Sequence, residues 1–182
     1  MKCFECAAEL KVVRENRRYK ECGLPNVVLR NIEVRRCPRC GAEDVVIPRL
    51  EDLHRLLAAV LLRKPGRLAS PEVRFLRKSL GWSAEGFAGH MGVARETVSR
   101  WENGHEQMSP VAERLLRLAV AHETPVQGYH VRELAAIAKG ESAPLQVTAR
   151  LAESRAGRQR GRPRPTAAAA AGSHSWELAQ AV

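Results

Sequence analysis

The sequence predicts an α+β fold, in which a small N-terminal β module is joined to an all-α domain and followed by a disordered C-terminal tail. Aliphatic and polar residues alternate within the first 47 residues, which is typical of strands, whereas apolar residues recur at helical spacing from Pro48 onward. Beyond Glu141 the chain is rich in Arg, Ala, Gly and Pro with little apolar periodicity, so burial would not offset the entropy of ordering it. These changes divide the chain into residues 1–47, 48–69, 70–140 and 141–182.

The β module is predicted from two alternating segments and the turn between them. Val27–Val34 alternates β-branched or aliphatic residues with polar ones, and Glu9–Val13 has a similar pattern. The intervening Gly23–Asn26, with the sequence Gly-Leu-Pro-Asn, is a typical turn signal. We therefore expect short antiparallel strands in this part of the chain.

Helix signals follow one another from Pro48. Apolar residues between Leu50 and Leu61 recur on one helical face, and Lys64–Gly66 breaks this linking helix at a predicted hinge. Ser70 and Ser109 are each followed by proline, a combination that favours an N-cap and the start of a helix. Five helices are expected after the hinge. The first two cover residues 70–80 and 83–91, and the third follows a turn at Gly92 and ends at Glu102. The fourth begins at Ser109, and the fifth covers residues 130–139.

Composition narrows the classes of function. The 182 residues carry a formal net charge of +10, which favours a polyanionic partner over a small acidic substrate. No stretch approaches the roughly 18 uninterrupted apolar residues of a membrane span, and two cysteines occupy the region where a signal peptide is charged. We therefore expect a cytoplasmic protein with no membrane contact.

Four cysteines form two Cys-x-x-Cys pairs separated by 30 residues. Each such turn aims two thiolates at one point, and four thiolates complete a closed tetrahedral zinc site with no position for a substrate water. We predict one structural Zn²⁺ per chain, held by Cys3, Cys6, Cys37 and Cys40. The alternatives are redox cysteines, which belong to βαβ units, and disulfides, which are unusual without an export signal. Cys22 has no partner at this spacing and is expected to be a free thiol.

The segment Leu80–Gly104 has the spacing of a helix-turn-helix, with Gly92 at the tight turn. The small side chain of Ala88 allows two helices to cross closely, and the apolar residues of the expected buried seam are Phe87, Met91, Val93, Val98 and Trp101. The polar residues placed to meet base edges are Arg95, Glu96, Thr97 and Arg100. The alternative is an ordinary three-helix bundle whose short helix merely exposes polar side chains.

This segment, LGWSAEGFAGHMGVARETVSRWENG, resembles the phage-repressor or Xre-type helix-turn-helix family. The resemblance implies that Arg95, Glu96 and Arg100 read the major groove of double-stranded DNA. It also places Asn103 and Gly104 near phosphate. One short recognition helix reads too few bases to find a unique site, so we expect a homodimer on a palindromic operator.

The same family pattern implies an ion pair between Arg77, late in the first helix, and Glu102. Two departures stand out. Ala84 occupies a position where the family usually has a phosphate-contacting Gln, and Ala94 replaces the usual Ser N-cap of the recognition helix. Both departures remove a side-chain hydrogen-bonding group, so we expect modest DNA affinity.

A module with two Cys-x-x-Cys pairs followed by an Xre-type domain resembles the MqsA-type antitoxins, or YgiT-type zinc-finger proteins, over about residues 1–140. The resemblance implies a zinc module that binds an RNA-cleaving toxin and a helix-turn-helix half that dimerises and represses its own operon. The alternative is a stand-alone zinc-finger regulator without a toxin partner. We do not expect an enzyme, because the six histidines show no metal-ligand spacing and no nucleophile or phosphate-loop motif is present.

The C-terminal tail contains the sequence Arg160, Gly161, Arg162 and Pro163, which resembles the core of an AT-hook. Glycine and proline keep such a segment narrow and extended, so that the arginines can lie along the minor groove of A·T-rich DNA. The alternative is a solvated basic run that attracts phosphate in general.

Overall fold

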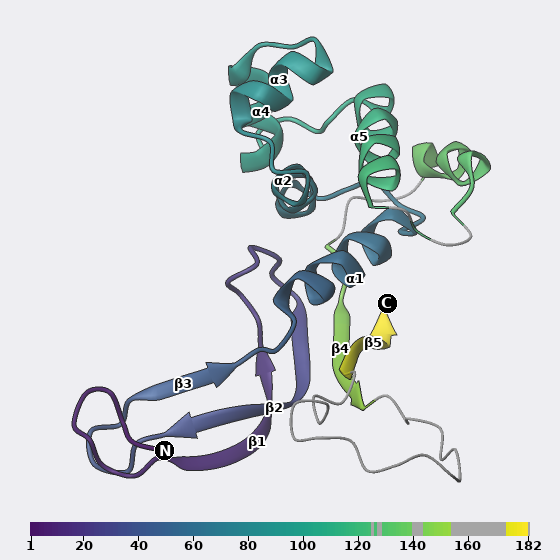
Figure 1. Ribbon diagram of the computed structural model, residues 1–182. Coiled ribbons are helices and arrows are strands. Elements are labelled where there is room, and N and C mark those ends of the chain that lie inside the picture. Colours follow the sequence, from purple (N-terminus) through teal and green to yellow (C-terminus); the bar gives the residue numbers. More distant parts are fainter. Residues whose placement is uncertain (125, 127–128, 140–143, 154–173, 182) are drawn as a thin grey trace, which may run out of the picture.

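The computed structural model describes residues 1–124, 126, 129–139, 144–153 and 174–181. A twisted β-sheet forms one part of the molecule and a group of helices forms the other, with the helix Leu50–Leu62 (α1) between them (Figure 1). This combination of a β module and a helical domain confirms the predicted α+β fold. No helix in these residues is both long and apolar enough to cross a membrane.

The strand Val27–Arg36 (β2) organises the sheet, because three other strands pair with it. The strand Lys11–Arg18 (β1) runs antiparallel along one edge of β2. On the other edge, Glu43–Val46 (β3) pairs antiparallel with the last residues of β2, and Val147–Glu153 (β4) pairs in parallel with its first residues. The change of partner falls at Asn31, whose φ of 56° breaks the regular alternation of the strand.

Two strands come from the C-terminal region that the sequence predicted to be a disordered tail. β4 joins the sheet beside β2, and His174–Ala181 (β5) pairs antiparallel with β4. Val147 and Ala149 are buried, and the indole Nε1 of Trp176 donates a hydrogen bond to the Pro48 carbonyl over 2.9 Å. The prediction of disorder is therefore wrong for residues 147–153 and 174–181, where a few apolar side chains complete the core.

One continuous apolar cluster connects the sheet to the helices. On α1, Leu53, Leu57 and Leu61 are fully buried at a spacing of four residues, so one face of the helix lies in the core. The same cluster contains Trp176 of β5 and Trp101 of the helical domain. The sheet and the helical domain therefore share a core.

The helical domain comprises Ser70–Ser79 (α2), Ala84–Met91 (α3), Arg95–Asn103 (α4), Pro110–Glu123 (α5) and the 3-10 helix Val131–Lys139 (η1). These bounds agree with the predicted helices, although the last takes the 3-10 form. Ser109 caps α5 as expected, since its Oγ accepts a hydrogen bond from the N–H of Ala112. The predicted cap at Ser70 is wrong: Ala69 is the N-cap of α2, and the Glu72 carboxylate accepts the Ala69 N–H at 2.7 Å.

Candidate nucleic-acid interface and metal centre

The turn between α3 and α4 is shaped by the residues at the helix ends. Ser83 caps α3, because its Oγ accepts a hydrogen bond from the N–H of Gly86 at 2.9 Å. Gly92 and Gly104 end α3 and α4 with φ values of 64° and 78°, a conformation that glycine adopts without steric cost. Ala94, the N-cap of α4, makes no side-chain cap, as its departure from the family pattern predicted.

An apolar seam packs α3 against α4. Phe87, Val98 and Trp101 are buried, and the Phe87 and Trp101 rings meet edge to face with their centroids 6.3 Å apart. The other two predicted members, Met91 and Val93, are half-buried at the edge of this seam. The seam fixes the rotation of α4 about the helix axis. The polar side of α4 therefore faces away from α3 and the core.

The polar side of α4 is open to solvent. Arg95, Glu96 and Arg100 are exposed, and Thr97 is half-buried. Within the part of the chain that the structure describes, the side chains of Arg95 and Glu96 have no hydrogen-bond or ion-pair partner. Arg100 has a contact of 3.9 Å between its Nη1 and Oε2 of Glu106, and a pair this exposed contributes little stability. The donors on this face therefore remain available to a ligand.

An ion pair holds the end of α4 against α2, as the family pattern implied. Arg77 donates from Nε and Nη2 to the Glu102 carboxylate at 2.5 Å and 3.1 Å. Its Nη1 donates to the carbonyl of Trp82 at 2.6 Å, which also fixes the start of the turn into α3. Both members of the pair are buried. The predicted contact between Arg77 and Glu102 is confirmed.

Arg74 extends this network to the residues that were expected near phosphate. Its Nε donates to Oε2 of Glu102 at 3.2 Å, and its Nη2 donates to Oδ1 of Asn103 at 2.8 Å. The Asn103 Nδ2 donates in turn to Ser99 Oγ at 3.2 Å, and the Gly104 N–H donates to the Arg100 carbonyl. Sequence patterns did not indicate a role for Arg74. The feature that could have indicated it is its position one helical turn before Arg77 on α2.

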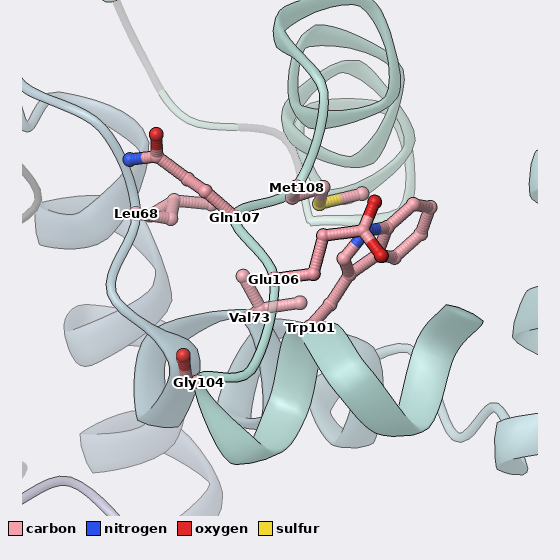
Figure 2. Close-up of a pocket in the computed structure, with 8 residues that line it drawn as sticks. Leu68, Val73, Trp101, Gly104, Glu106, Gln107 and Met108 are labelled. Carbon is pink, nitrogen blue, oxygen red and sulfur yellow. The ribbon is translucent and has the colours of Figure 1, made fainter. Parts of the chain in front are cut away.

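A cavity of about 180 Å³ lies beside the end of α4 (Figure 2). Its walls are both apolar, from Leu68, Val73 and Met108, and polar, and the chain from Gly104 onward passes along it. The indole Nε1 of Trp101 is buried without a hydrogen-bond partner among the described residues. The cavity lies on the core side of α4, so it is separate from the exposed polar face.

The four predicted cysteine ligands come together at the N-terminal end of the sheet. The Sγ atoms of Cys3, Cys6, Cys37 and Cys40 all lie within 4.8 Å of one another, so the cluster could hold a metal ion. Two of the distances between Sγ atoms are 3.6 Å, from Cys3 to Cys40, and 3.4 Å, from Cys6 to Cys37. Cys22 lies outside the cluster, and its thiol donates to the Tyr19 carbonyl at 3.3 Å.

Two equivalent backbone turns build this cluster. The Ala7 N–H donates to the Cys3 carbonyl at 2.9 Å, and the Gly41 N–H donates to the Cys37 carbonyl at 3.0 Å. Ala7 and Gly41 occupy corresponding positions, with φ values of 59° and 76°. The left-handed conformation costs a residue with a Cβ atom about 1–2 kcal/mol, so Ala7 bears strain that Gly41 avoids.

The backbone also favours the thiolate form at one of the cysteines. A hydrogen bond from the N–H of Cys40, supported by one from Arg39, lowers the pKa of the Cys37 thiol to about 6. Thiolates, rather than thiols, are the metal-binding form of cysteine. The donor set of four sulfur atoms therefore suits a soft or borderline metal ion.

Buried charges fix the segment between α1 and α2. Lys64 Nζ lies 2.6 Å from Oε2 of Glu72, and Arg67 Nε lies 2.7 Å from Oε2 of Glu113. Arg117 Nη2 lies 2.9 Å from the other oxygen of Glu113, and both of these side chains are fully buried. Sequence patterns did not indicate this network. Its signal is the position of Glu113 and Arg117 on the face of α5 that also carries buried apolar residues.

Arg117 joins this network to the backbone of the predicted hinge. Its guanidinium donates to four carbonyls at distances between 2.7 Å and 3.3 Å, those of Leu61, Leu62, Lys64 and Gly66. Oε1 of Glu72 accepts a further hydrogen bond, at 2.7 Å, from the N–H of Leu145, just before β4. The segment Lys64–Gly66 is therefore anchored to α5, which positions the helical domain relative to the sheet.

Comparison with known families identifies the helical domain. The helix-turn-helix family model matches residues 73–129, a range that contains α3, α4, α5 and most of α2. Residues 73–129 form an Xre-type helix-turn-helix domain. This is a family of DNA-binding regulators, and the domain supports a DNA-binding transcription regulator. The curated proteins and the solved structures gave no match to the chain.

The helix-turn-helix domain carries every residue predicted to contact the major groove. The structure leaves Arg95, Glu96 and Arg100 of α4 exposed and Thr97 half-buried, and it sets Asn103 and Gly104 at the end of the helix. The residues predicted to form an AT-hook, Arg160 to Pro163, lie outside the described residues.

Proposed function

We propose that the protein is a transcriptional repressor that reads an operator with the exposed side of α4. The observation that carries this proposal is the set of exposed polar side chains on a helix whose opposite side is fixed by the apolar seam and the Arg77–Glu102 pair. An arginine such as Arg95 or Arg100 can donate two hydrogen bonds to O6 and N7 of one guanine. Asn103 and Gly104 would then lie near the DNA backbone.

Binding titrations of Arg100→Ala on a selected operator and on a scrambled duplex test this assignment. The variant should lose about 1–3 kcal/mol of preference for the operator, because a bidentate contact with guanine discriminates by that amount. Arg132→Ala, at an exposed arginine of η1, is the matched control and should keep the preference. An Arg100→Ala protein with full operator preference would contradict the assignment.

We further propose that the cysteine cluster holds one structural Zn²⁺. In a tetrahedral site with zinc–sulfur bonds of about 2.3 Å, neighbouring sulfur atoms are about 3.8 Å apart. The Sγ distances of 3.4 Å and 3.6 Å are close to that spacing. When bound, the ion would cross-link the two cysteine turns, and four protein ligands would leave it no catalytic position.

Metal analysis of anaerobically purified protein should give about one zinc per chain. Cys37→Ser should lose the metal and unfold the N-terminal module, because a structural zinc site contributes directly to folding. Cys22→Ser is the matched control, because this thiol lies outside the cluster, and it should retain the zinc. Wild-type protein without zinc would overturn the proposal.

A homodimer is the expected DNA-binding form. Val111, Leu115 and Leu118 recur at helical spacing on α5 and are 73%, 44% and 45% exposed. We propose that a second copy covers this apolar stripe, since an isologous contact between DNA-binding domains matches the two-fold symmetry of a palindrome. In sedimentation experiments Leu115→Glu should be monomeric, whereas the control Val131→Glu, at an exposed apolar residue of η1, should remain dimeric. A dimeric Leu115→Glu protein would exclude this interface.

The combination of a four-cysteine module with an Xre-type domain supports a role as the antitoxin of a type II toxin–antitoxin system. In this proposal the N-terminal module neutralises an RNA-cleaving toxin, and the helix-turn-helix domain represses the shared operon. This proposal requires a small open reading frame beside the gene whose expression arrests growth, and coexpression of this protein should restore growth. If that reading frame has no effect on growth, the protein is a stand-alone regulator.

A further inference from the structure

A basic groove of about 660 Å³ lies on the sheet. Three exposed arginines line it, Arg14 from β1, Arg30 from β2 and Arg150 from β4, together with Asn16 and Asn31. The strands that supply them lie side by side in the order β1, β2, β4 (Figure 1). We refer to this feature as the basic groove.

Strand register places two of these arginines next to each other. Arg30 is the Cα partner of Arg150 in the parallel pair of β2 and β4, and the residues before them, Leu29 and Ala149, point into the core. Like charges directly opposite each other on neighbouring strands are destabilising. Arg150 has a partial counter-charge, because its Nη2 lies 3.2 Å from Oε2 of Glu177 in an exposed pair.

The positive charge at Arg30 is not compensated. Its side chain has no hydrogen-bond or ion-pair partner in the described part of the chain, and the described residues that line the basic groove include no acidic side chain. Asn16 and Asn31 are held in place at the irregular point of the sheet, where Asn16 Oδ1 accepts the Asn31 N–H at 3.2 Å. Arg14 also points to this place, with its Nη1 3.5 Å from the Asn31 carbonyl.

The arginine and asparagine side chains of the basic groove favour phosphate as the group that binds there. Guanidinium groups match the oxygens of a phosphate with paired hydrogen bonds, and amides add neutral donors. No aromatic side chain is among the described residues that line the groove, so it lacks a platform on which single-stranded bases would stack. An RNA-cleaving protein must itself attract a polyanion, and its basic surface would be repelled here.

We propose that the basic groove binds the phosphodiester backbone of duplex DNA, as a second contact that is independent of base sequence and separate from α4. This contact adds affinity and salt dependence to DNA binding but no operator preference, because phosphate contacts carry no base information. It also assigns a nucleic-acid role to the sheet, to which Arg150 of β4 contributes.

Fluorescence anisotropy with the full chain and a random-sequence duplex tests the proposal through Arg30→Ala. Loss of one phosphate contact makes the negative slope of log affinity against log salt less steep by about 0.9. Between 50 and 200 mM salt the variant should therefore lose about 3-fold less affinity than the wild-type protein. Arg132→Ala removes the same charge from an exposed position of η1 and serves as the control. Equal affinities and slopes for Arg30→Ala and Arg132→Ala would overturn the proposal.

Two further measurements separate this contact from others. In an Arg95→Ala, Arg100→Ala background, Arg30→Ala should still reduce binding to random DNA, so the result does not depend on operator recognition by α4. Inorganic tripolyphosphate should displace duplex DNA only weakly at equal phosphate concentration, because it spans fewer contacts. Displacement as effective as that by unlabelled duplex would show that the groove takes small polyphosphates, and it would overturn the assignment to DNA.

Discussion

Replacement of Arg117 by Met tests whether the buried charges between α1 and α5 stabilise the domain arrangement. The guanidinium is fully buried, and it donates to Glu113 at 2.9 Å and to four backbone carbonyls. Removing one partner of a buried ion pair costs about 3–5 kcal/mol. For Arg117→Met we expect the free energy of unfolding to fall by about 4 kcal/mol, within this range. Glu113 keeps its pair with Arg67, and the carbonyls of Leu61 and Leu62 lie at the end of a helix.

Urea unfolding of the zinc-loaded protein, followed by far-ultraviolet circular dichroism, measures this loss. With a denaturant slope of about 2 kcal/mol/M, a loss of 4 kcal/mol lowers the midpoint by about 2 M. The matched control is Arg55→Met on α1, whose exposed pair with Asp52 should contribute less than about 1 kcal/mol. A midpoint for Arg117→Met that equals the midpoint of the control would refute the role assigned to the network.

Three further substitutions test separate parts of the structure. Glu102→Ala should lower the free energy of unfolding by about 3 kcal/mol, because it leaves Arg77 buried without its partner; an unchanged melting temperature would count against the pair. Ala7→Gly should raise the stability of the zinc-loaded module by about 1 kcal/mol by relieving the left-handed conformation, and a loss of stability in chelator titrations would contradict this. Trp176→Ala should cost about 3 kcal/mol by thermal unfolding, whereas no change would mean that β5 does not contribute to the core.

Burial lowers the pKa of His54, whose Nε2 lies 2.9 Å from the Tyr19 hydroxyl. The unfolded state therefore binds more protons than the folded state once the pH falls below about 6.5, and the free energy of unfolding decreases there. His54→Gln should show a weaker decrease between pH 7 and pH 5 in matched urea titrations. Identical pH profiles would contradict this contribution.

Local patterns predicted most of the candidate sites, because a helix-turn-helix and a four-cysteine cluster are specified by residues close together in sequence. Gly92 marked the tight turn, and the Cys-x-x-Cys spacing marked the cluster. The parallel pairing of β2 with β4 joins segments more than 100 residues apart, and no local pattern encodes such a partner. The seven residues of β4 are also too few for their alternation to outweigh the basic, low-complexity sequence that follows.

Buried charge is the second feature that sequence patterns did not indicate. Charged residues are almost never fully buried unless they are paired, so the sequence pattern alone gives no reason to place Glu72 and Glu113 in the core. Their partners Lys64 and Arg67 lie in the interhelical segment, where a Lys-Pro-Gly sequence predicted a hinge. Only the folded chain brings these residues together, because the pairs link positions between 8 and 46 residues apart.

Selection of fragments from the host genome by the purified protein, followed by sequencing, tests the central claim most directly. Zinc-loaded wild-type protein should enrich a palindromic sequence whose half-sites are about one helical turn, or roughly 34 Å, apart. The Arg95→Ala, Arg100→Ala variant should bind DNA without enriching that sequence, because the contacts to phosphate remain and the contacts to bases are lost. Failure of folded wild-type protein to enrich any sequence, or enrichment of the same sequence by the variant, would contradict the assignment of α4 as the reading helix.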